Sequence, residues 1–177
     1  NMFGCYVINP VSPAGSEVGD DRSSWIAVAG VRVKTHPCID VLARGRVPGR
    51  RVAVIGAGGI GYDVSEFLVN GGHSPTLDPP AWFREWGVDT TMAARGGVAG
   101  VAPQPGPPAR EVYLLQRGEG KFGARLGKTS GWVHRAALKA MRVQTIGGVV
   151  YERIDDRGLH LRIGNDIRVL DVDDIVL

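Results

Sequence analysis

Three glycines in a short run carry the clearest chemical signal in this sequence. Gly56, Gly58 and Gly61 directly follow the apolar stretch 52–55 and directly precede a helical pattern. In such a turn the first glycine allows a tight bend, the second lets the backbone approach a pyrophosphate, and the third lets the helix pack on the strand. The helix N-terminus then offers free N–H groups and a positive dipole end to phosphates. The pattern predicts that a dinucleotide binds to Gly56, Ala57, Gly58, Gly59, Ile60 and Gly61, and the competing interpretation is a structural turn without a ligand.

The residues after the second predicted strand indicate which dinucleotide would fit. This strand covers 111–116 and ends in Gln116-Arg117, with Lys121 close behind and no carboxylate at its tip. NAD sites place Asp or Glu there to accept hydrogen bonds from the ribose 2′-OH. A guanidinium suits a 2′-phosphate instead, because it is planar, always charged and bidentate. The sequence therefore predicts NADPH, with Gln116, Arg117 and Lys121 as further cofactor-binding residues; the alternative is that Arg117 is a solvated loop residue.

The spacing between these two features is unusual. Arg117 lies 56 positions after Gly61, whereas about 20 is typical. The segment 71–110 contains seven glycines and seven prolines among its forty residues, which is typical of a long functional or disordered loop. A Gly/Pro-rich insertion at 71–110, with one short helix at 81–86, therefore explains the spacing.

The order of the predicted elements defines the fold class. Continuous apolar runs predict buried parallel strands, 3.6-residue periodicity predicts helices, and period-two alternation near the C-terminus predicts an antiparallel meander. The result is an α/β fold, a Rossmann-like parallel sheet with an antiparallel β-meander crossover. Strands are expected at 25–33, 52–55, 111–116, 143–146 and 174–177, helices at 63–68 and after Thr129-Ser130, a helical turn at 39–42, and the meander at 149–154, 159–163 and 167–169.

Composition excludes several classes of protein. Of the 177 residues, 44% are hydrophobic and 22% charged, which is globular composition. No apolar run reaches the ~18 residues that a transmembrane helix needs. The net charge of +3 comes from scattered basic residues, so neither a nucleic-acid partner nor a membrane partner is expected. Cys5 and Cys38 are the only cysteines, which favours a reduced, cytoplasmic chain without a cysteine-held cluster.

The remaining polar residues suggest no further chemistry. The four histidines show no metal-ligand spacing, and His134 and His160 are expected on the solvated surface. The adjacent pairs Asp155-Asp156 and Asp173-Asp174 are expected to cap turns. We therefore predict no catalytic residue and no metal site within this chain.

Three stretches together resemble the NADPH-binding region of bacterial-type 2,4-dienoyl-CoA reductases, which are iron–sulfur flavoproteins related to old yellow enzyme. They are RVAVIGAGGIGYDVSEFL (51–68), VYLLQRGEGKFGARLGKTSGWVHRAAL (112–138) and GGVVYERIDDRGLHL (147–161). The resemblance implies that 36–177 is an NAD(P)H-binding domain, and that 1–35 is an unassigned segment with the remnant of a FAD-binding half.

The resemblance also implies a reaction. NADPH would reduce FAD, and electrons would pass through an iron–sulfur cluster to FMN, where a dienoyl-CoA of fatty acid β-oxidation is reduced. FAD, FMN and the cluster are implied only for a full-length parent, whose FAD and FMN domains would be the partners of this chain. Two alternatives stay open: a module of another two-nucleotide flavoprotein, such as an amine dehydrogenase relative, and a truncated, non-catalytic nucleotide-binding fragment.

Overall fold

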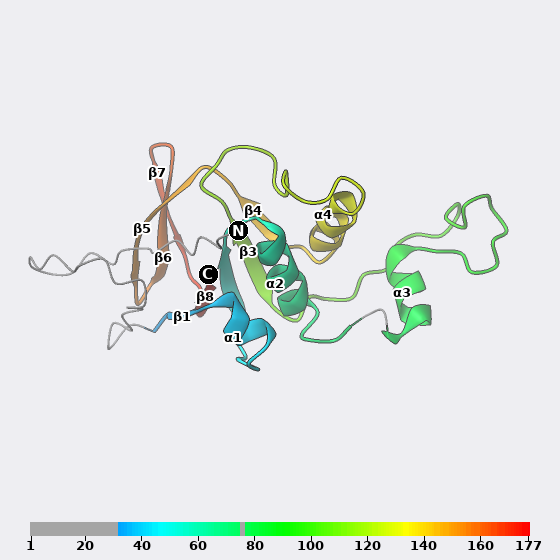
Figure 1. Cartoon of the computed structure of the whole chain (residues 1–177), viewed down its shortest axis with the longest axis horizontal. Helices are drawn as coiled ribbons and strands as arrows, with labels where there is room; N and C mark the ends of the chain where they lie inside the picture. Colours follow the sequence, from blue (N-terminus) through cyan, green and yellow to red (C-terminus); the bar gives the residue numbers. More distant parts are fainter. Residues whose placement is uncertain (1–31, 75–76) are drawn as a thin grey trace, which may run out of the picture.

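The computed structural model describes residues 32–74 and 77–177, which form three layers (Figure 1). The central layer is a five-stranded parallel sheet in the order β1-β8-β2-β3-β4, and the three-stranded sheet β5-β6-β7 is antiparallel. The strands are β1 Lys34–His36, β2 Arg51–Ile55, β3 Glu111–Leu115, β4 Gln144–Ile146, β5 Val149–Asp155, β6 Gly158–Ile163, β7 Asp166–Leu170 and β8 Asp174–Val176; the helices are α1 Cys38–Leu42, α2 Gly59–Val69, α3 Pro79–Trp86 and α4 Gly131–Ala140. The predicted α/β fold with its meander is confirmed.

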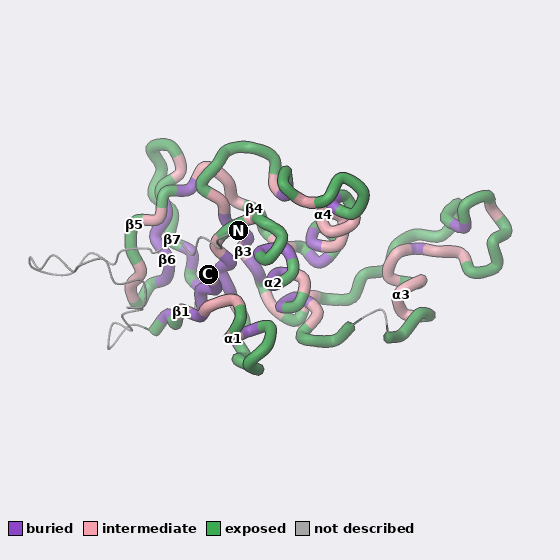
Figure 2. Tube along the Cα trace, viewed as in Figure 1, coloured by how far each residue is buried: buried purple, intermediate pink, exposed green. Residues whose placement is uncertain are grey.

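Alternation along the central strands explains the three layers. Val52 and Val54 of β2 point into a core shared with α2 and α4, whereas Ala53 between them points into a second core shared with the meander. All three are almost fully buried. The strand is therefore covered on both sides, as its continuous apolar sequence predicts, and the buried residues cluster around the parallel sheet (Figure 2).

The first strand differs from the sequence-based expectation. Most of the predicted strand 25–33 lies outside the described residues, and Arg32 and Val33 are not in a strand. The strand β1 instead occupies a segment predicted as a connector, and it pairs with β8 in register Lys34↔Asp174. Because β1 is a three-residue edge strand with one buried residue, it lacks the apolar run that marks a strand in sequence.

Two helices also differ in detail. The helix predicted at 63–68 begins four residues earlier, at Gly59, because the second half of the glycine run is itself helical. The helix predicted after Thr129-Ser130 is α4, in which Gly131 and Leu138 are buried and Ala140 is exposed. The short helix predicted at 81–86 is confirmed as α3, which starts at Pro79.

His160 is buried, so its predicted place on the solvated surface is wrong. Its side chain is 4% exposed and its Nε2 atom lies 2.8 Å from Asp155, although the angle falls short of a hydrogen bond. β6 is the middle strand of the meander, so β5 and β7 pair with both of its edges. Contact with His160 lowers the pKa of Asp155, whose carboxylate also accepts the Arg157 N–H at 2.9 Å and so caps the turn as predicted.

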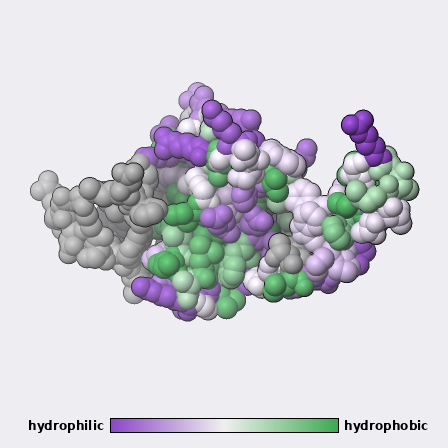
Figure 3. Space-filling model, turned by 45° about the vertical axis from the view of Figure 1, so that its right-hand side comes forward, coloured by the Kyte–Doolittle hydropathy of each residue, from purple (hydrophilic) through white to green (hydrophobic). Residues whose placement is uncertain are grey.

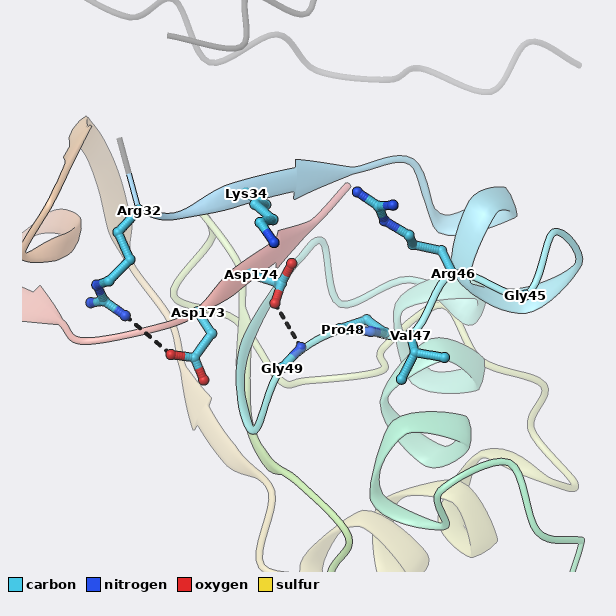
Figure 4. A pocket seen from close by; sticks show the side chains of 9 residues that line it. All are labelled: Arg32, Lys34, Gly45, Arg46, Val47, Pro48, Gly49, Asp173 and Asp174. Atoms are coloured by element: carbon cyan, nitrogen blue, oxygen red, sulfur yellow. Dashed lines mark hydrogen bonds and ion pairs between the residues drawn. The ribbon is translucent and has the colours of Figure 1, made fainter. Parts of the chain in front are cut away.

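The pair Asp173-Asp174 does more than cap a turn. Asp174 lies in β8, buried, with its carboxylate 2.6 Å from Nε2 of His36 and accepting the Gly49 N–H at 2.7 Å. Asp173 accepts the backbone N–H groups of Arg50 and Arg51 at 3.1 and 3.0 Å, and it pairs with the side chains of Arg32 and Arg51. Figure 4 shows both carboxylates reaching from β8 and its approach toward the segments that flank β1 and β2. These contacts tie the last strand of the sheet to the first two.

We expect Asp173→Ala to lower the free energy of unfolding by about 1–3 kcal/mol near pH 7, because two backbone donors and two guanidinium groups lose their acceptor. Hydrogen bonds from the Arg51 side chain lower the pKa of Asp173, and those from Arg32 lower the pKa of Asp171. A carboxyl whose pKa is lower in the folded state contributes stability above its unfolded pKa and loses it as the pH falls through the folded value.

The difference in the free energy of unfolding between Asp173→Ala and the unaltered chain should therefore shrink below about pH 4, where carboxyl groups titrate. Urea unfolding at several pH values measures it. The exposed Asp166 serves as the control position, and an Asp166→Ala variant should have the same free energy of unfolding as the unaltered chain. An equal loss in both variants would refute the role given to Asp173.

The helix α3 lies in the inserted segment, away from the sheet (Figure 1). Asp78 caps its start by accepting the Ala81 N–H at 3.1 Å, and Gly87 ends it with φ 69°, yet none of its residues is buried. Its aromatic rings contact one another, with Trp82 centred 5.6 Å from Phe83 and 5.9 Å from Trp86. The projecting end carries both hydrophobic and hydrophilic surface (Figure 3). Local capping and ring contacts, rather than the main core, therefore hold this helix.

Among the helices that the structure describes, none has the length and apolar character to cross a membrane.

Candidate functional site

The glycine turn lies where the central strand ends and the first long helix begins. The Gly56 N–H donates to the carbonyl of Leu115 at 2.9 Å, which joins the carboxyl ends of β2 and β3. Gly58 is the N-cap of α2, with φ −85° and ψ −174° and no side chain to cap the helix. The first backbone N–H groups of α2 therefore stand at the carboxyl edge of the parallel sheet, where ligands of open α/β sheets bind.

The structure separates the glycines that the fold needs from those that it does not. Gly56 has φ +106°, a conformation that side chains disfavour, and a Cβ on Gly61 would lie 1.8 Å from the Gly56 carbonyl oxygen. A Cβ on Gly58 or Gly59 would meet no atom within 4 Å. Backbone conformation therefore accounts for Gly56, and packing accounts for Gly61. The two middle ones leave the backbone bare on an open side, and this suits the close approach of a phosphate.

The other two residues of the predicted turn lie on opposite sides of it. Ala57 is half-buried and packs against the core that α2 and α4 share. Ile60 is 42% exposed in the first turn of α2. An exposed isoleucine beside a bare backbone offers an apolar contact to the non-phosphate part of a bound nucleotide.

Gln116 follows β3 and organises the loop behind it. Its side-chain amide donates to the carbonyls of Gly118 and Gly120 at 3.0 and 2.5 Å. Its backbone N–H donates to Ile146, and its carbonyl accepts the Val149 N–H. Both amide hydrogens are therefore used within the chain, which makes Gln116 a residue that shapes the site rather than one that donates to a ligand.

Arg117 and Lys121 are exposed in the loop that Gln116 shapes. Burial raises the pKa of Tyr151 in β5 to about 12, and the positive charge of Arg117 opposes this rise. Arg117 therefore lies close enough to β5 for its charge to act on the phenol. The loop leaves the carboxyl end of β3, next to the glycine turn, so both cations belong to the same edge of the sheet as Gly58.

The loop 117–130 is anchored against the helices by residues that sequence reasoning did not identify. Phe122 and Leu126 pack against the core beside α2. A Cβ on Gly123 would lie 2.9 Å from the buried hydroxyl of Tyr62, so the loop crosses α2 in close contact. The Arg135 guanidinium donates to the Gly123 carbonyl at 3.4 Å. These contacts fix the basic loop next to the N-terminal end of α2.

One sequence signal could have pointed to this anchoring. Tyr62 directly follows the last glycine of the turn, and a tyrosine in an apolar helical face needs somewhere to place its hydroxyl. Burial raises the pKa of that hydroxyl, and the charge of Arg135 opposes the change. His134, predicted on the surface, is only partly exposed and places Nδ1 3.2 Å from Glu66 of α2. In the described residues, no group of three or more histidines, cysteines or carboxylates is arranged to hold a metal.

Comparison with known proteins finds no family model that matches this sequence. Solved structures with a similar fold include a 2-naphthoyl-CoA reductase in complex with 2-naphthoyl-CoA, with a TM-score of 0.55, 15% identity, and coverage of 80% of this chain and 16% of that one. Histamine dehydrogenase from Rhizobium sp. 4-9 has a TM-score of 0.52 and 9% identity, with 82% and 18% of the two chains covered. The 6-hydroxypseudooxynicotine amine oxidase from Pseudomonas geniculata N1 has a TM-score of 0.50 and 12% identity, with 82% and 17% covered.

These likenesses show the fold. The chain has the α/β architecture of FAD/NAD(P)-binding Rossmann domains, and it spans less than a fifth of the length of each of these three structures.

Proposed function

We propose that this chain is the NADPH-binding module of a flavin-dependent oxidoreductase that resembles 2,4-dienoyl-CoA reductase. One observation carries the proposal: Gly58 and Gly59 have no structural need to be glycine, yet they leave the backbone bare at the N-terminus of α2. A pyrophosphate bound there would accept the free N–H groups of the first helical turn. The site comprises Gly56, Ala57, Gly58, Gly59, Ile60 and Gly61 on one strand end, with Gln116, Arg117 and Lys121 on the next.

The basic loop supports NADPH over NADH. No carboxylate stands at the tip of β3 to accept hydrogen bonds from a ribose 2′-OH; Arg117 stands there instead, with Lys121 four residues later. In this proposal Arg117 pairs with the 2′-phosphate, Lys121 adds positive charge, and Gln116 holds the loop in place. The unit that we propose covers 36–177, and β1 supports a start two residues earlier, at Lys34.

NADPH supplies a hydride, which FAD accepts in the proposed reaction. The residues of this chain bind the pyrophosphate, orient the dinucleotide along the carboxyl edge of the sheet, and select the 2′-phosphate. We assign no catalytic residue to this chain. FAD, FMN and an iron–sulfur cluster would belong to other domains of the full-length protein.

Titration calorimetry of NADPH and NADH against the chain tests the proposal. We expect NADPH to bind at least about 10-fold more tightly than NADH at low ionic strength, because a 2′-phosphate paired with a guanidinium gains a charge-assisted contact. The preference should narrow as salt is added. Equal affinity for the two nucleotides would contradict the preference for NADPH. If a folded chain bound neither nucleotide, the proposed function would be wrong.

A second candidate function is the corresponding module of an amine dehydrogenase relative. The fold similarity to histamine dehydrogenase and to the amine oxidase favours it. Substrate profiling of the full-length protein separates the two, because a CoA thioester is expected as substrate only for the first candidate. The third alternative, a non-catalytic nucleotide-binding chain, predicts nucleotide binding by the chain but no NADPH-driven flavin reduction in the full-length protein.

A further inference from the structure

The edge of the parallel sheet opposite the glycine turn carries a hollow with an excess of positive charge. Gly56 follows the carboxyl end of β2, whereas this hollow lies at the amino end of the same strand. Its volume is about 620 Å³, and its charged lining residues are Arg50, Arg51, Arg110, Arg142, Glu111 and Asp173. Four arginines face two carboxylates, so the formal charge of the lining is +2.

The two carboxylates of the hollow are already engaged. Asp173 accepts the backbone N–H groups of Arg50 and Arg51 and pairs with the Arg51 guanidinium at 2.7 Å. Glu111 accepts the Tyr113 hydroxyl at 2.6 Å and the Gln144 side-chain amide at 3.0 Å. Neither carboxylate forms an ion pair with the other arginines of the lining.

The arginines fall into two groups. Arg51 is paired with Asp171 and Asp173. Arg110 is fixed in the wall, because its guanidinium donates to three backbone carbonyls, those of Pro48, Gly49 and Leu68, at 3.1, 3.1 and 3.2 Å. No carboxylate neutralises its charge in these contacts.

Arg50 and Arg142 form the second group. Both are exposed, and neither guanidinium has a hydrogen-bond or ion-pair partner among the residues that the structure describes. Arg110 adds a third charge of this kind. Three positive charges without a paired carboxylate therefore line one concave surface. Like charges held around a concave surface repel one another and attract anions.

The backbone conformation of Arg142 supports the same interpretation. It has φ 59°, the left-handed conformation, at the position that follows the C-cap of α4. Its N–H donates to Lys139 and the Val143 N–H donates to Leu138, which is the Schellman pattern that usually places glycine here. An arginine costs about 1–2 kcal/mol in this conformation. A glycine at position 142 would avoid this conformational strain, but it would not place a guanidinium in the lining of the hollow.

We propose that this hollow is a second anion site, which binds the phosphate or pyrophosphate group of a small ligand through Arg50 and Arg142, with Arg110 held in its wall. Guanidinium groups suit this ligand because their planar donors bind phosphate oxygens in pairs. The volume is within the range of small-molecule sites. A neighbouring hollow, lined by Arg32, Lys34 and Arg46 and also by Asp173 and Asp174, shares Asp173 with this one (Figure 4).

The test is calorimetric titration of inorganic pyrophosphate at low ionic strength. The variant Gly58→Asp closes the glycine turn to anions and leaves the second site as the one under study. In that background we expect pyrophosphate still to bind, and Arg142→Gly to weaken it at least about 10-fold, with Arg50→Ala having a similar effect. Because glycine suits the backbone of position 142, the Arg142→Gly variant should melt no lower than the unaltered chain, so misfolding cannot explain the loss.

A matched control removes the same charge elsewhere. Arg95 is exposed in the inserted segment, and Arg95→Gly should leave pyrophosphate binding unchanged. Loss of all pyrophosphate binding in Gly58→Asp alone, or equal weakening by Arg95→Gly and Arg142→Gly, would overturn the proposal. A parallel titration with ADP identifies the source of the phosphate: tighter binding than pyrophosphate assigns a nucleotide, and weaker binding assigns a free phosphate compound.

Discussion

A Gly58→Asp variant is expected to lose NADPH binding by at least about 100-fold while its stability rises by a few tenths of a kcal/mol. The loss follows from the geometry of the turn, because a carboxylate there would occupy the space of the pyrophosphate and repel it. The gain follows from the helix, because Gly58 is the N-cap of α2 and contributes no side chain to it. An aspartate at this position can accept the N–H groups of the first turn and complements the helix dipole.

The Gly61→Ala variant is the matched comparison, because it changes a glycine of the same turn that the fold requires. Its Cβ would lie 1.8 Å from the Gly56 carbonyl oxygen, so α2 must move away from β2. We expect a loss of about 3 kcal/mol or more in the free energy of unfolding. Chemical unfolding and NADPH titration of both variants separate the two roles. Retained NADPH affinity in a folded Gly58→Asp variant would show that the nucleotide does not bind at this turn.

For Arg117→Ala, we expect a loss of about 1.5–3 kcal/mol in NADPH binding, or roughly 10- to 150-fold in Kd, and little change for NADH. The two nucleotides differ only in the 2′-phosphate, so a selective loss identifies the group that Arg117 contacts. Titration calorimetry of both nucleotides measures it. Thermal unfolding should accompany each titration, because Arg117 also acts on Tyr151 within the chain.

The control for this variant is Arg125→Ala, which removes the same charge from an exposed position of the same loop. A general electrostatic effect would weaken NADPH binding equally in the two variants, and a specific contact would weaken it only in Arg117→Ala. Equal losses for NADPH and NADH in Arg117→Ala would place the arginine elsewhere, for example on the pyrophosphate.

The central part of the fold could be predicted from sequence because it follows simple patterns. The run 52–55 is apolar on both faces, and the structure buries it between two cores. The meander alternates with period two, and its strands pair with the expected neighbours. Edge elements gave no such signal. The strand β1 has three residues, and among the residues that the structure describes it pairs with β8 alone, so its existence depends on a partner about 140 positions away rather than on its own sequence.

The candidate site likewise has one part that could be predicted from the sequence and one part that could not. The glycine turn could be predicted because Gly56 and Gly61 meet local backbone requirements between a strand and the helix that follows it. The anchoring of the basic loop could not, because it depends on contacts between distant segments, such as Gly123 against Tyr62. Buried polar pairs were missed for a related reason: the partner of His160 lies in another strand, and that of His36 lies at the other end of the chain. Periodicity places a side chain on a face but does not say what covers that face.

The strand order has a consequence for the time course of folding. The central strand β2 pairs on one side with β3 and on the other with β8, and Val52 lies opposite Asp174. The second pairing closes a loop of about 120 residues, which is entropically costly and slow for parallel strands. During synthesis, about 120 further residues therefore have to be made before the second neighbour of β2 exists. Until then one edge of the most apolar strand is open to other chains, and this interval is when the protein is most exposed to aggregation.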